Sequence, residues 1–164
     1  MNYRVLHLAD LERFLELRME FLLSYQDVPE DFQNITENYL RNRMKTEDLL
    51  LSAAEEEGSL VAACMVCFYE TCPMVDNPSG KYGELRNVYT KPAYRRKGIS
   101  EKLVCMALEK AKERGVTKLR LHYTDDGLPL YQKLGKRREY EKRNCYHGCQ
   151  RTQPEKYRFD HSQR

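Results

Sequence analysis

The feature that most constrains the fold is a strand, a basic loop and a helix that follow one another within residues 83–115. Residues 84–90 alternate as a strand does and end on β-favouring side chains, and Pro92 stops this strand. The basic loop of residues 95–98 then leads directly into an amphipathic helical pattern over residues 99–114. The sequence therefore predicts an α/β domain in which this helix packs against a sheet.

The start of the predicted helix has the features of an anion-binding site. The first N–H groups of a helix have no partner within the helix, and a partial positive charge lies behind them. Gly98 has no side chain to block a ligand, and Arg95, Arg96 and Lys97 precede it. This combination predicts a cradle for phosphate groups. The simpler alternative is a solvated basic turn that only caps the helix.

The rest of the chain up to residue 135 predicts further strands and helices. Strands are expected at residues 3–8, 49–54, 60–69 and 116–123, and helices at residues 11–25, 36–45 and 129–135. The run LVAACMVCFY over residues 60–69 is apolar on both of its faces, which is typical of a central strand that is covered twice. Residues 136–164 alternate only weakly, and we expect one strand and a basic polar tail there.

Length and composition indicate one soluble domain. The chain has 164 residues, of which 32% are charged and 41% hydrophobic, and this length is enough to bury a core. It holds no run of eighteen apolar residues, and its first residues lack the apolar region of a secretory signal. We therefore expect a cytoplasmic protein with reduced cysteines and no membrane partner.

The charge pattern gives little reason to expect a nucleic-acid partner. The formal net charge is +3, and residues 133–164 hold ten Lys and Arg against four Asp and Glu. The body of the chain is therefore mildly acidic, and we do not expect nucleic acid as a partner. The sequence leaves open whether the chain forms a homodimer.

The six cysteines do not predict a metal site. Cys64 and Cys67 are three residues apart in a predicted strand, so their side chains point to opposite faces. Cys145 and Cys149 have a spacing closer to that of metal ligands, but no second pair with zinc-site spacing accompanies them. We expect core cysteines and no metal.

Two segments together resemble the GNAT N-acetyltransferase family. The segment NVYTKPAYRRKGIS, residues 87–100, is similar to its acetyl-CoA motif R/Q-x-x-G-x-G/A. The segment PLYQKLG, residues 129–135, is similar to the tyrosine-bearing motif that follows the fifth strand. Ser100 stands where the family usually has Gly or Ala, and Lys136 stands where it usually has Phe.

The resemblance covers roughly residues 3–135 and implies the GNAT acyl-CoA N-acyltransferase fold. This is an α/β fold with a mixed, mainly antiparallel sheet flanked by helices. Residues 1–135 then form the N-acetyltransferase domain, to which residues 136–164 also belong. Whether residues after Lys136 form the family's closing hairpin stays open.

The resemblance also implies an activity and a cofactor site. The activity is transfer of an acetyl group from acetyl-CoA to a primary amine, a small molecule in preference to a protein, by direct attack through a tetrahedral intermediate. The backbone N–H of Val88 would face the thioester oxygen, while Tyr89 and Thr90 contact the pantetheine arm. The pyrophosphate would lie on the basic loop and the first helical turn, at Arg95, Arg96, Lys97, Gly98, Ile99 and Ser100.

Two catalytic residues follow from the resemblance. An alkyl amine has a pKa of about 10, so near neutral pH it needs a base to become a nucleophile. Glu84 falls where histone-type members place a catalytic glutamate, although other members use a chain of waters. Tyr131 corresponds to the tyrosine that protonates the departing thiolate.

The sequence says less about the part of the site that binds the acceptor amine. Glu70 and the pair Asp125 and Asp126 are further carboxylates that could bind the acceptor, and Asp76 with Glu84 favours a cationic small amine. The alternative function is a non-catalytic module that binds acyl-CoA or nucleic acid.

Overall fold

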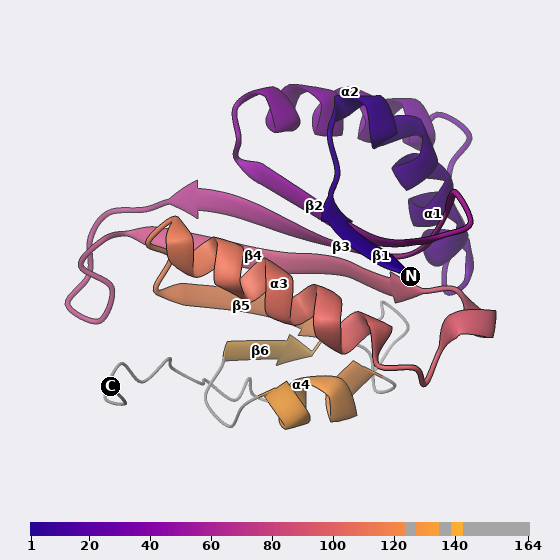
Figure 1. The fold of residues 1–164 in the computed structure, drawn as a ribbon. Coiled ribbons are helices and arrows are strands. Elements are labelled where there is room, and N and C mark those ends of the chain that lie inside the picture. Colours follow the sequence, from indigo (N-terminus) through magenta and orange to yellow (C-terminus); the bar gives the residue numbers. More distant parts are fainter. Residues whose placement is uncertain (124–126, 135–138, 143–164) are drawn as a thin grey trace.

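A computed structural model describes residues 1–123, 127–134 and 139–142 (Figure 1). The described chain contains six strands and four α-helices, with short 3₁₀ turns at Leu8–Asp10 and Pro92–Tyr94. The strands are β1 (Asn2–Val5), β2 (Leu49–Glu56), β3 (Ser59–Glu70), β4 (Lys81–Thr90), β5 (Lys118–Tyr123) and β6 (Glu139–Lys142). The α-helices are α1 (Leu11–Leu23), α2 (Phe32–Lys45), α3 (Ile99–Glu113) and α4 (Leu128–Leu134).

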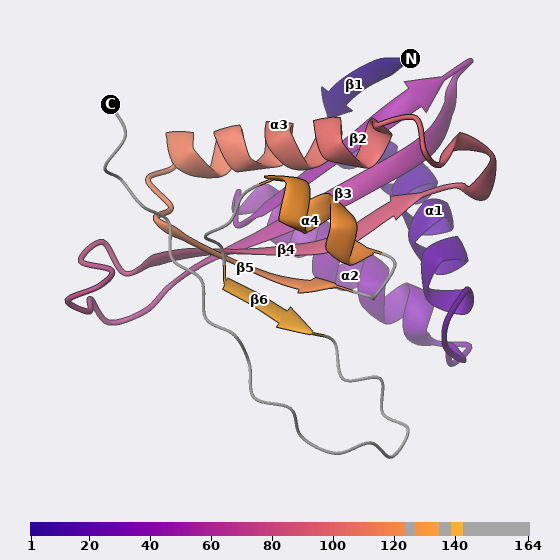
Figure 2. The ribbon, with the colours of Figure 1, turned by 90° about the horizontal axis from the view of Figure 1, so that it is seen from below.

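The six strands form one mixed sheet in the order β1-β2-β3-β4-β5-β6. Neighbouring strands from β1 to β4 are antiparallel, whereas β5 is parallel to β4 and β6 is parallel to β5. Helices α1 and α2 lie on one face of this sheet, and α3 crosses the other (Figures 1 and 2). The predicted α/β fold with a mixed sheet and flanking helices is confirmed.

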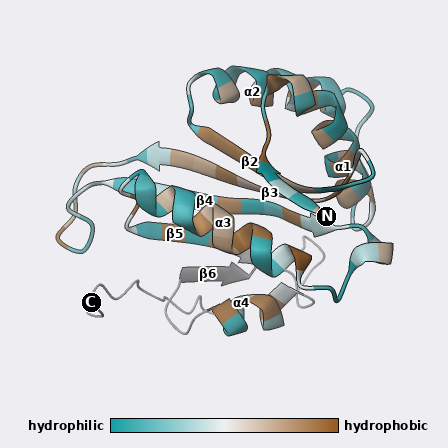
Figure 3. Cartoon of the chain, in the orientation of Figure 1, coloured by the Kyte–Doolittle hydropathy of each residue, from teal (hydrophilic) through white to brown (hydrophobic). Residues whose placement is uncertain are grey.

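Each face of the sheet has its own hydrophobic core. The α3-side core includes Leu103 of α3 with Val66 and Leu85, and the α1/α2-side core includes Phe14 and Leu40. Strand β3 contributes to both cores, because successive side chains of a strand point to opposite faces. Figure 3 accordingly shows largely hydrophobic positions along β2 and β3. The expectation of a doubly covered central strand is confirmed.

Several element boundaries differ from the sequence-based ones. Helix α2 begins four residues before the expected position 36, after the turn at Pro29, and the carbonyl of Asp31 accepts a bond from the N–H of Ile35. Strand β4 begins three residues before position 84, because Lys81 pairs with Glu70 of β3. Beyond residue 135 the one expected strand is β6, while residues 143–164, and with them any second closing strand, lie outside the described residues.

In the described part of the chain, no helix is both long and apolar enough to cross a membrane. The longest of the four α-helices, α3, has fifteen residues, whereas a span needs about twenty apolar ones.

An ion-pair network fastens β1 to the start of α1. Arg4 donates hydrogen bonds of 2.6 and 2.8 Å to the two carboxylate oxygens of Asp10, and it also bonds Glu55 of β2 at 2.9 Å. The bonds from Arg4 and from the backbone N–H of His7 hold the pKa of Asp10 well below its usual range. The network therefore joins the edge strand β1, the neighbouring strand β2 and the 3₁₀ turn that precedes α1.

Replacing Asp10 with asparagine should lower the free energy of unfolding by about 2 kcal/mol at pH 7, the contribution typical of hydrogen bonds to a charged group. Because folding depresses the pKa of Asp10, this contribution is complete above about pH 4 and is lost as the pH falls further. Urea denaturation of wild type and variant at pH 7 and pH 3 measures the difference. The exposed Asp27→Asn change is the control, and equal stability of wild type and Asp10→Asn at pH 7 would contradict the prediction.

Candidate functional site

The N-terminus of α3 is not covered by any of the described residues. Gly98 precedes the helix with φ of +73°, a conformation that favours glycine, and a Cβ placed on it would meet no atom of the described residues within 4 Å. Among residues 1–123, 127–134 and 139–142, no side chain caps this helix start, and the carbonyl of Gly98 accepts the first helical bond, from Lys102, at 3.2 Å. Arg95, Arg96 and Lys97 are all exposed around it. The geometry is that of an accessible anion-binding helix end.

The loop is held against the end of β4. Thr90 shares a 2.7 Å hydroxyl–hydroxyl hydrogen bond with Ser100 in the first turn of α3. Arg95 donates a bond of 3.1 Å from Nε to the carbonyl of Thr90, and its guanidinium lies 5.9 Å from the ring centre of Tyr89. Ile99 is buried in the α3-side core, so only its backbone can face a ligand. The helix end and the strand end therefore form one continuous surface.

Strands β4 and β5 are paired over only part of their length. Their register runs from Tyr82 opposite Lys118 to Leu85 opposite Leu121, and β4 continues beyond this to Thr90. A bulge interrupts the β3–β4 pairing here, and Asn87 takes φ of +51° within it. The sheet thus opens between β4 and β5 just after Leu85.

The backbone N–H of Val88 points toward this opening. The bond of 2.9 Å from the N–H of Lys91 to the carbonyl of Val61 sets the phase of the antiparallel ladder. Backbone groups of successive residues in a strand point alternately to the two neighbouring strands. Tyr89 is opposite Ala63, so its N–H and carbonyl face β3, whereas those of Val88 and Thr90 face the side of β5. Val88, whose N–H is expected to face the thioester oxygen, and Thr90, one of the two residues expected to contact the pantetheine arm, therefore have backbone groups on the side of the opening, whereas those of Tyr89 face β3.

The two predicted catalytic residues project from opposite faces of the sheet. Leu85 is buried in the α3-side core, so its neighbour Glu84 lies on the α1/α2 face, where it accepts a bond of 2.6 Å from Arg86. Tyr131 of α4 is 3% exposed within the α3-side core, and its ring centre lies 6.3 Å from that of Tyr123. Groups on these two faces can act on one molecule only where the sheet is open.

A polar cluster on the α1/α2 face was not singled out from the sequence. Arg18 of α1 donates a bond of 2.7 Å to the side-chain oxygen of Asn87, and the hydroxyl of Tyr89 donates one of 2.8 Å to Glu20. Burial, and then the bond to Glu20, raise the pKa of Tyr89. Asparagine tolerates positive φ better than most residues. An asparagine within a predicted strand is therefore the sequence signal that could have indicated a bulge at Asn87.

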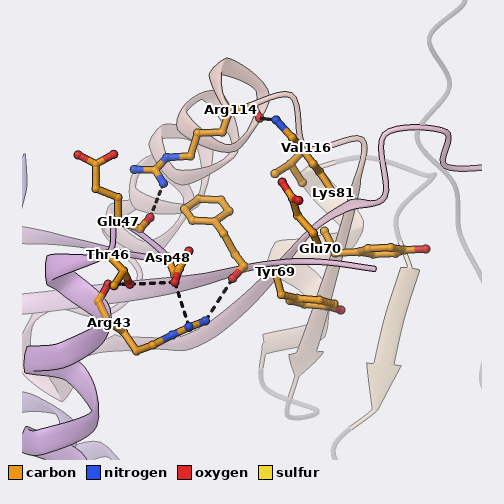
Figure 4. A pocket seen from close by; sticks show the side chains of 11 residues that line it. Arg43, Thr46, Glu47, Asp48, Tyr69, Glu70, Lys81, Arg114 and Val116 are labelled. Carbon is orange, nitrogen blue, oxygen red and sulfur yellow. Dashed lines mark hydrogen bonds and ion pairs between the residues drawn. The ribbon is translucent and has the colours of Figure 1, made fainter. Parts of the chain in front are cut away.

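A cavity lies at the other end of α3, away from this opening, and Figure 4 shows the residues that line it. Its volume is about 640 Å³, and Glu70 and Arg114 are among its lining residues. Arg114 follows the C-terminus of α3, so a helix of fifteen residues, about 22 Å long, separates the cavity from Gly98. The cavity is lined by groups bonded to one another: Arg43 pairs with Asp48 at 2.9 Å, and the Arg114 guanidinium lies 4.5 Å from the ring centre of Phe68.

Of the other carboxylates proposed for the acceptor, the two that the structure describes, Glu70 and Asp76, lie away from the opening. Glu70 lines the distant cavity, and Asp76 forms an ion pair with Lys118. Asp125 and Asp126 lie outside the described residues. Asp76 therefore gives no support to the expectation of a cationic acceptor, because its charge is already neutralised.

Within the described ranges, no group of three His, Cys, Asp or Glu side chains could hold a metal ion. Cys64 contributes to the α3-side core and Cys67 packs against the opposite core, as the strand spacing predicts. Burial raises the pKa of Cys64 to about 12, so this thiol stays protonated. Cys145 and Cys149 lie outside the described residues.

Comparisons with known proteins agree on one family. The sequence profile described as Acetyltransferase (GNAT) family matches residues 11–136. A search among curated proteins finds no match. Among solved structures, a predicted acetyltransferase from Clostridium acetobutylicum, crystallised with acetyl-CoA, is 25% identical; the match covers 91% of this chain and 95% of that one, with a TM-score of 0.78.

Two further structures share the fold. A GCN5-related N-acetyltransferase from Ralstonia eutropha is 24% identical, with 93% and 97% of the two chains covered and a TM-score of 0.73. Glucosamine-6-phosphate N-acetyltransferase from Arabidopsis thaliana is 22% identical, with 97% and 98% covered and a TM-score of 0.63. Since the family profile spans most of the sequence, this chain belongs to the GNAT family of acetyltransferases, which transfer an acetyl group from acetyl-CoA.

Proposed function

We propose that this chain acetylates the primary amine of a small molecule, with acetyl-CoA bound between the start of α3 and the opening in the sheet. One observation carries the proposal: the open, uncapped helix end at Gly98 is joined by the Thr90–Ser100 bond to the strand that borders the opening. The helix end, where the pyrophosphate is proposed to bind, is thereby adjacent to the opening between β4 and β5. The acetyl-CoA in the similar Clostridium structure supports the same ligand here.

The residues of the cradle fit the pyrophosphate of CoA. Space is open where a side chain of residue 98 would stand, and backbone N–H groups of the first turn of α3 surround it. The guanidinium of Arg95 and the ammonium of Lys97 add charge at its rim. The backbone of Val88 and Thr90 offers hydrogen bonds to the pantetheine arm, whose amides run alongside a strand edge well.

Acetyl-CoA, when bound, supplies an acetyl group activated as a thioester. Glu84, on the α1/α2 face, accepts the proton that the amine nitrogen loses as the N–C bond forms. The N–H of Val88 donates a hydrogen bond to the acetyl oxygen. Tyr131, on the α3 face, donates the proton that the sulfur gains as the C–S bond breaks. The opening lets the amine approach from one face and the thiol leave on the other.

The test is release of free thiol from acetyl-CoA, measured against a broad panel of small primary amines and lysine-containing peptides. Thiol release that depends on a small amine, together with mass-spectrometric detection of the acetylated product, is the expected result. Binding of acetyl-CoA without turnover by any amine would instead favour a non-catalytic acyl-CoA-binding module.

Replacing Tyr131 with phenylalanine should lower kcat by about a hundredfold near pH 7, while the affinity for acetyl-CoA measured by calorimetry stays close to that of wild type. Because thiols have a pKa of about 8.5, the departing thiolate needs a proton donor less as the pH rises, and the defect should shrink above that value. Tyr123→Phe is the matched control, since its ring is the neighbour of Tyr131. A kcat for Tyr131→Phe equal to wild type at every pH would remove Tyr131 from the mechanism.

A further inference from the structure

Asn87 carries a buried hydrogen-bond donor that has no partner among the described residues. The residue is 3% exposed, and its side-chain nitrogen Nδ2 is buried without a hydrogen bond to any part of the chain that the structure describes. Most buried polar groups of proteins are paired, so an unpaired one points to strain or to an absent ligand. Asn87 lies in the bulge of β4, two residues after Leu85, the last residue of β4 that pairs with β5. The unpaired donor therefore belongs to a residue at the edge of the opening.

The orientation of the Asn87 amide is fixed. The guanidinium of Arg18 has only donors, so the atom that it contacts at 2.7 Å must be the side-chain oxygen of Asn87. The amide nitrogen consequently points away from Arg18 and cannot be exchanged with the oxygen by a flip. A ligand that meets this nitrogen must offer an acceptor, such as a carbonyl or carboxylate oxygen.

The bulge places a second donor on the same face. Arg86 is opposite Met65, which belongs to the α1/α2-side core, and Asn87 reaches α1 on that face. Two successive side chains of β4 thus share one face, which a regular strand does not allow. The contact with Glu84 uses one of the five N–H groups of the Arg86 guanidinium. A cation and an amide donor accordingly stand next to the proposed base.

We propose that the acceptor is an α-amino carboxylate, whose carboxylate binds Asn87 Nδ2 and the Arg86 guanidinium while its amine faces Glu84 and the opening. A carboxylate has two oxygens, one for each of these donors, and its negative charge suits Arg86. The amine is one carbon away, so both groups can contact residues 84–87 of one strand. The inference rests on the acetyl transfer proposed above and adds the class of acceptor.

The experiment compares matched acceptors. Alanine, leucine and phenylalanine are each tested beside the corresponding amino amide and the corresponding amine without the carboxylate: ethylamine, isoamylamine and phenethylamine. The expected result is a kcat/KM for at least one of the amino acids that is tenfold or more above those of its amide and its plain amine. Plain amines or amides that react as well as the acids, or acids that never react, would overturn the assignment.

Two variants of Asn87 test the contact itself. Asn87→Gly suits the positive φ and removes the donor, while Asn87→Asp keeps the size and replaces the donor with an acceptor. Both should reduce the preference for the amino acid over its plain amine tenfold or more, chiefly through KM. Asn42→Asp, at an exposed position of α2, adds the same charge as Asn87→Asp and should leave the preference unchanged. An unchanged preference in Asn87→Gly would overturn the role of Asn87.

These experiments test the class of acceptor separately from the acetyl-transfer reaction. An enzyme that binds acetyl-CoA and acetylates plain amines alone refutes the α-amino carboxylate and leaves acetyl transfer standing. Failure to bind acetyl-CoA by calorimetry refutes the proposed function and the inference together.

Discussion

Replacing Gly98 with glutamate is expected to abolish acetyl-CoA binding in calorimetry, with a loss of affinity of at least a hundredfold. The change places a carboxylate in the open space before α3, where the pyrophosphate is proposed to lie. Like charges at contact distance repel most strongly where solvent is excluded, and the side chain also occupies the volume of the ligand. The N–H groups of the first turn would then be blocked by the new carboxylate itself.

The control must separate ligand binding from backbone strain, because Gly98 has φ of +73°. Gly58 is a close match: its φ is +77°, and a Cβ placed on it also meets nothing within 4 Å. Gly58→Glu therefore carries the same charge and a similar strain at the β2–β3 turn, and it should bind acetyl-CoA as wild type does. Gly98→Asn, which tolerates positive φ, should bind more weakly than wild type but better than Gly98→Glu. Unchanged affinity in Gly98→Glu would contradict the cradle.

The strand end, basic loop and helix start of the proposed cofactor site could be predicted from the sequence, because the features that determine them are local. The strand end, the basic loop and the helix start are contiguous, and the requirement for glycine before the helix follows from one backbone conformation. The bond between Thr90 and Ser100 spans only ten residues. Such features depend on residues close together in the chain, so a short sequence motif is enough to predict them.

The proposed acceptor site could not be predicted from the sequence, because the contacts around it join residues that are distant in sequence. Arg18 and Asn87 are sixty-nine positions apart, and only the packing of α1 against the sheet brings them together. The bulge that places Arg86 and Asn87 on one face is a departure from strand periodicity, so a reading based on alternation assigns them to opposite faces. Ion pairs formed in the fold also change the charge that a ligand meets. From the sequence alone Glu84 counts as a negative charge, whereas in the fold it accepts a hydrogen bond from Arg86.

Glu84→Gln should lower kcat/KM for the best acceptor by about a hundredfold or more at pH 7, as is usual when a general base is removed. Without the base, the reaction depends on amine already deprotonated in solution, so the rate of the variant should rise steadily toward the amine pKa of about 10. The ratio of wild-type to variant rates should therefore narrow with increasing pH. Initial rates of thiol release from pH 6 to pH 10 measure this ratio.

The control for Glu84→Gln is Glu37→Gln on α2, because Glu37 accepts a bond from Arg41 at the same 2.6 Å that joins Glu84 to Arg86. It removes an equivalent ion pair away from β4 and should leave kcat/KM near the wild-type value. If water molecules accept the proton instead of Glu84, Glu84→Gln will retain its rate at pH 7 and show the pH profile of wild type. A loss confined to KM would assign Glu84 to binding the ammonium form of the acceptor, whereas a loss in kcat that disappears at high pH identifies it as the base.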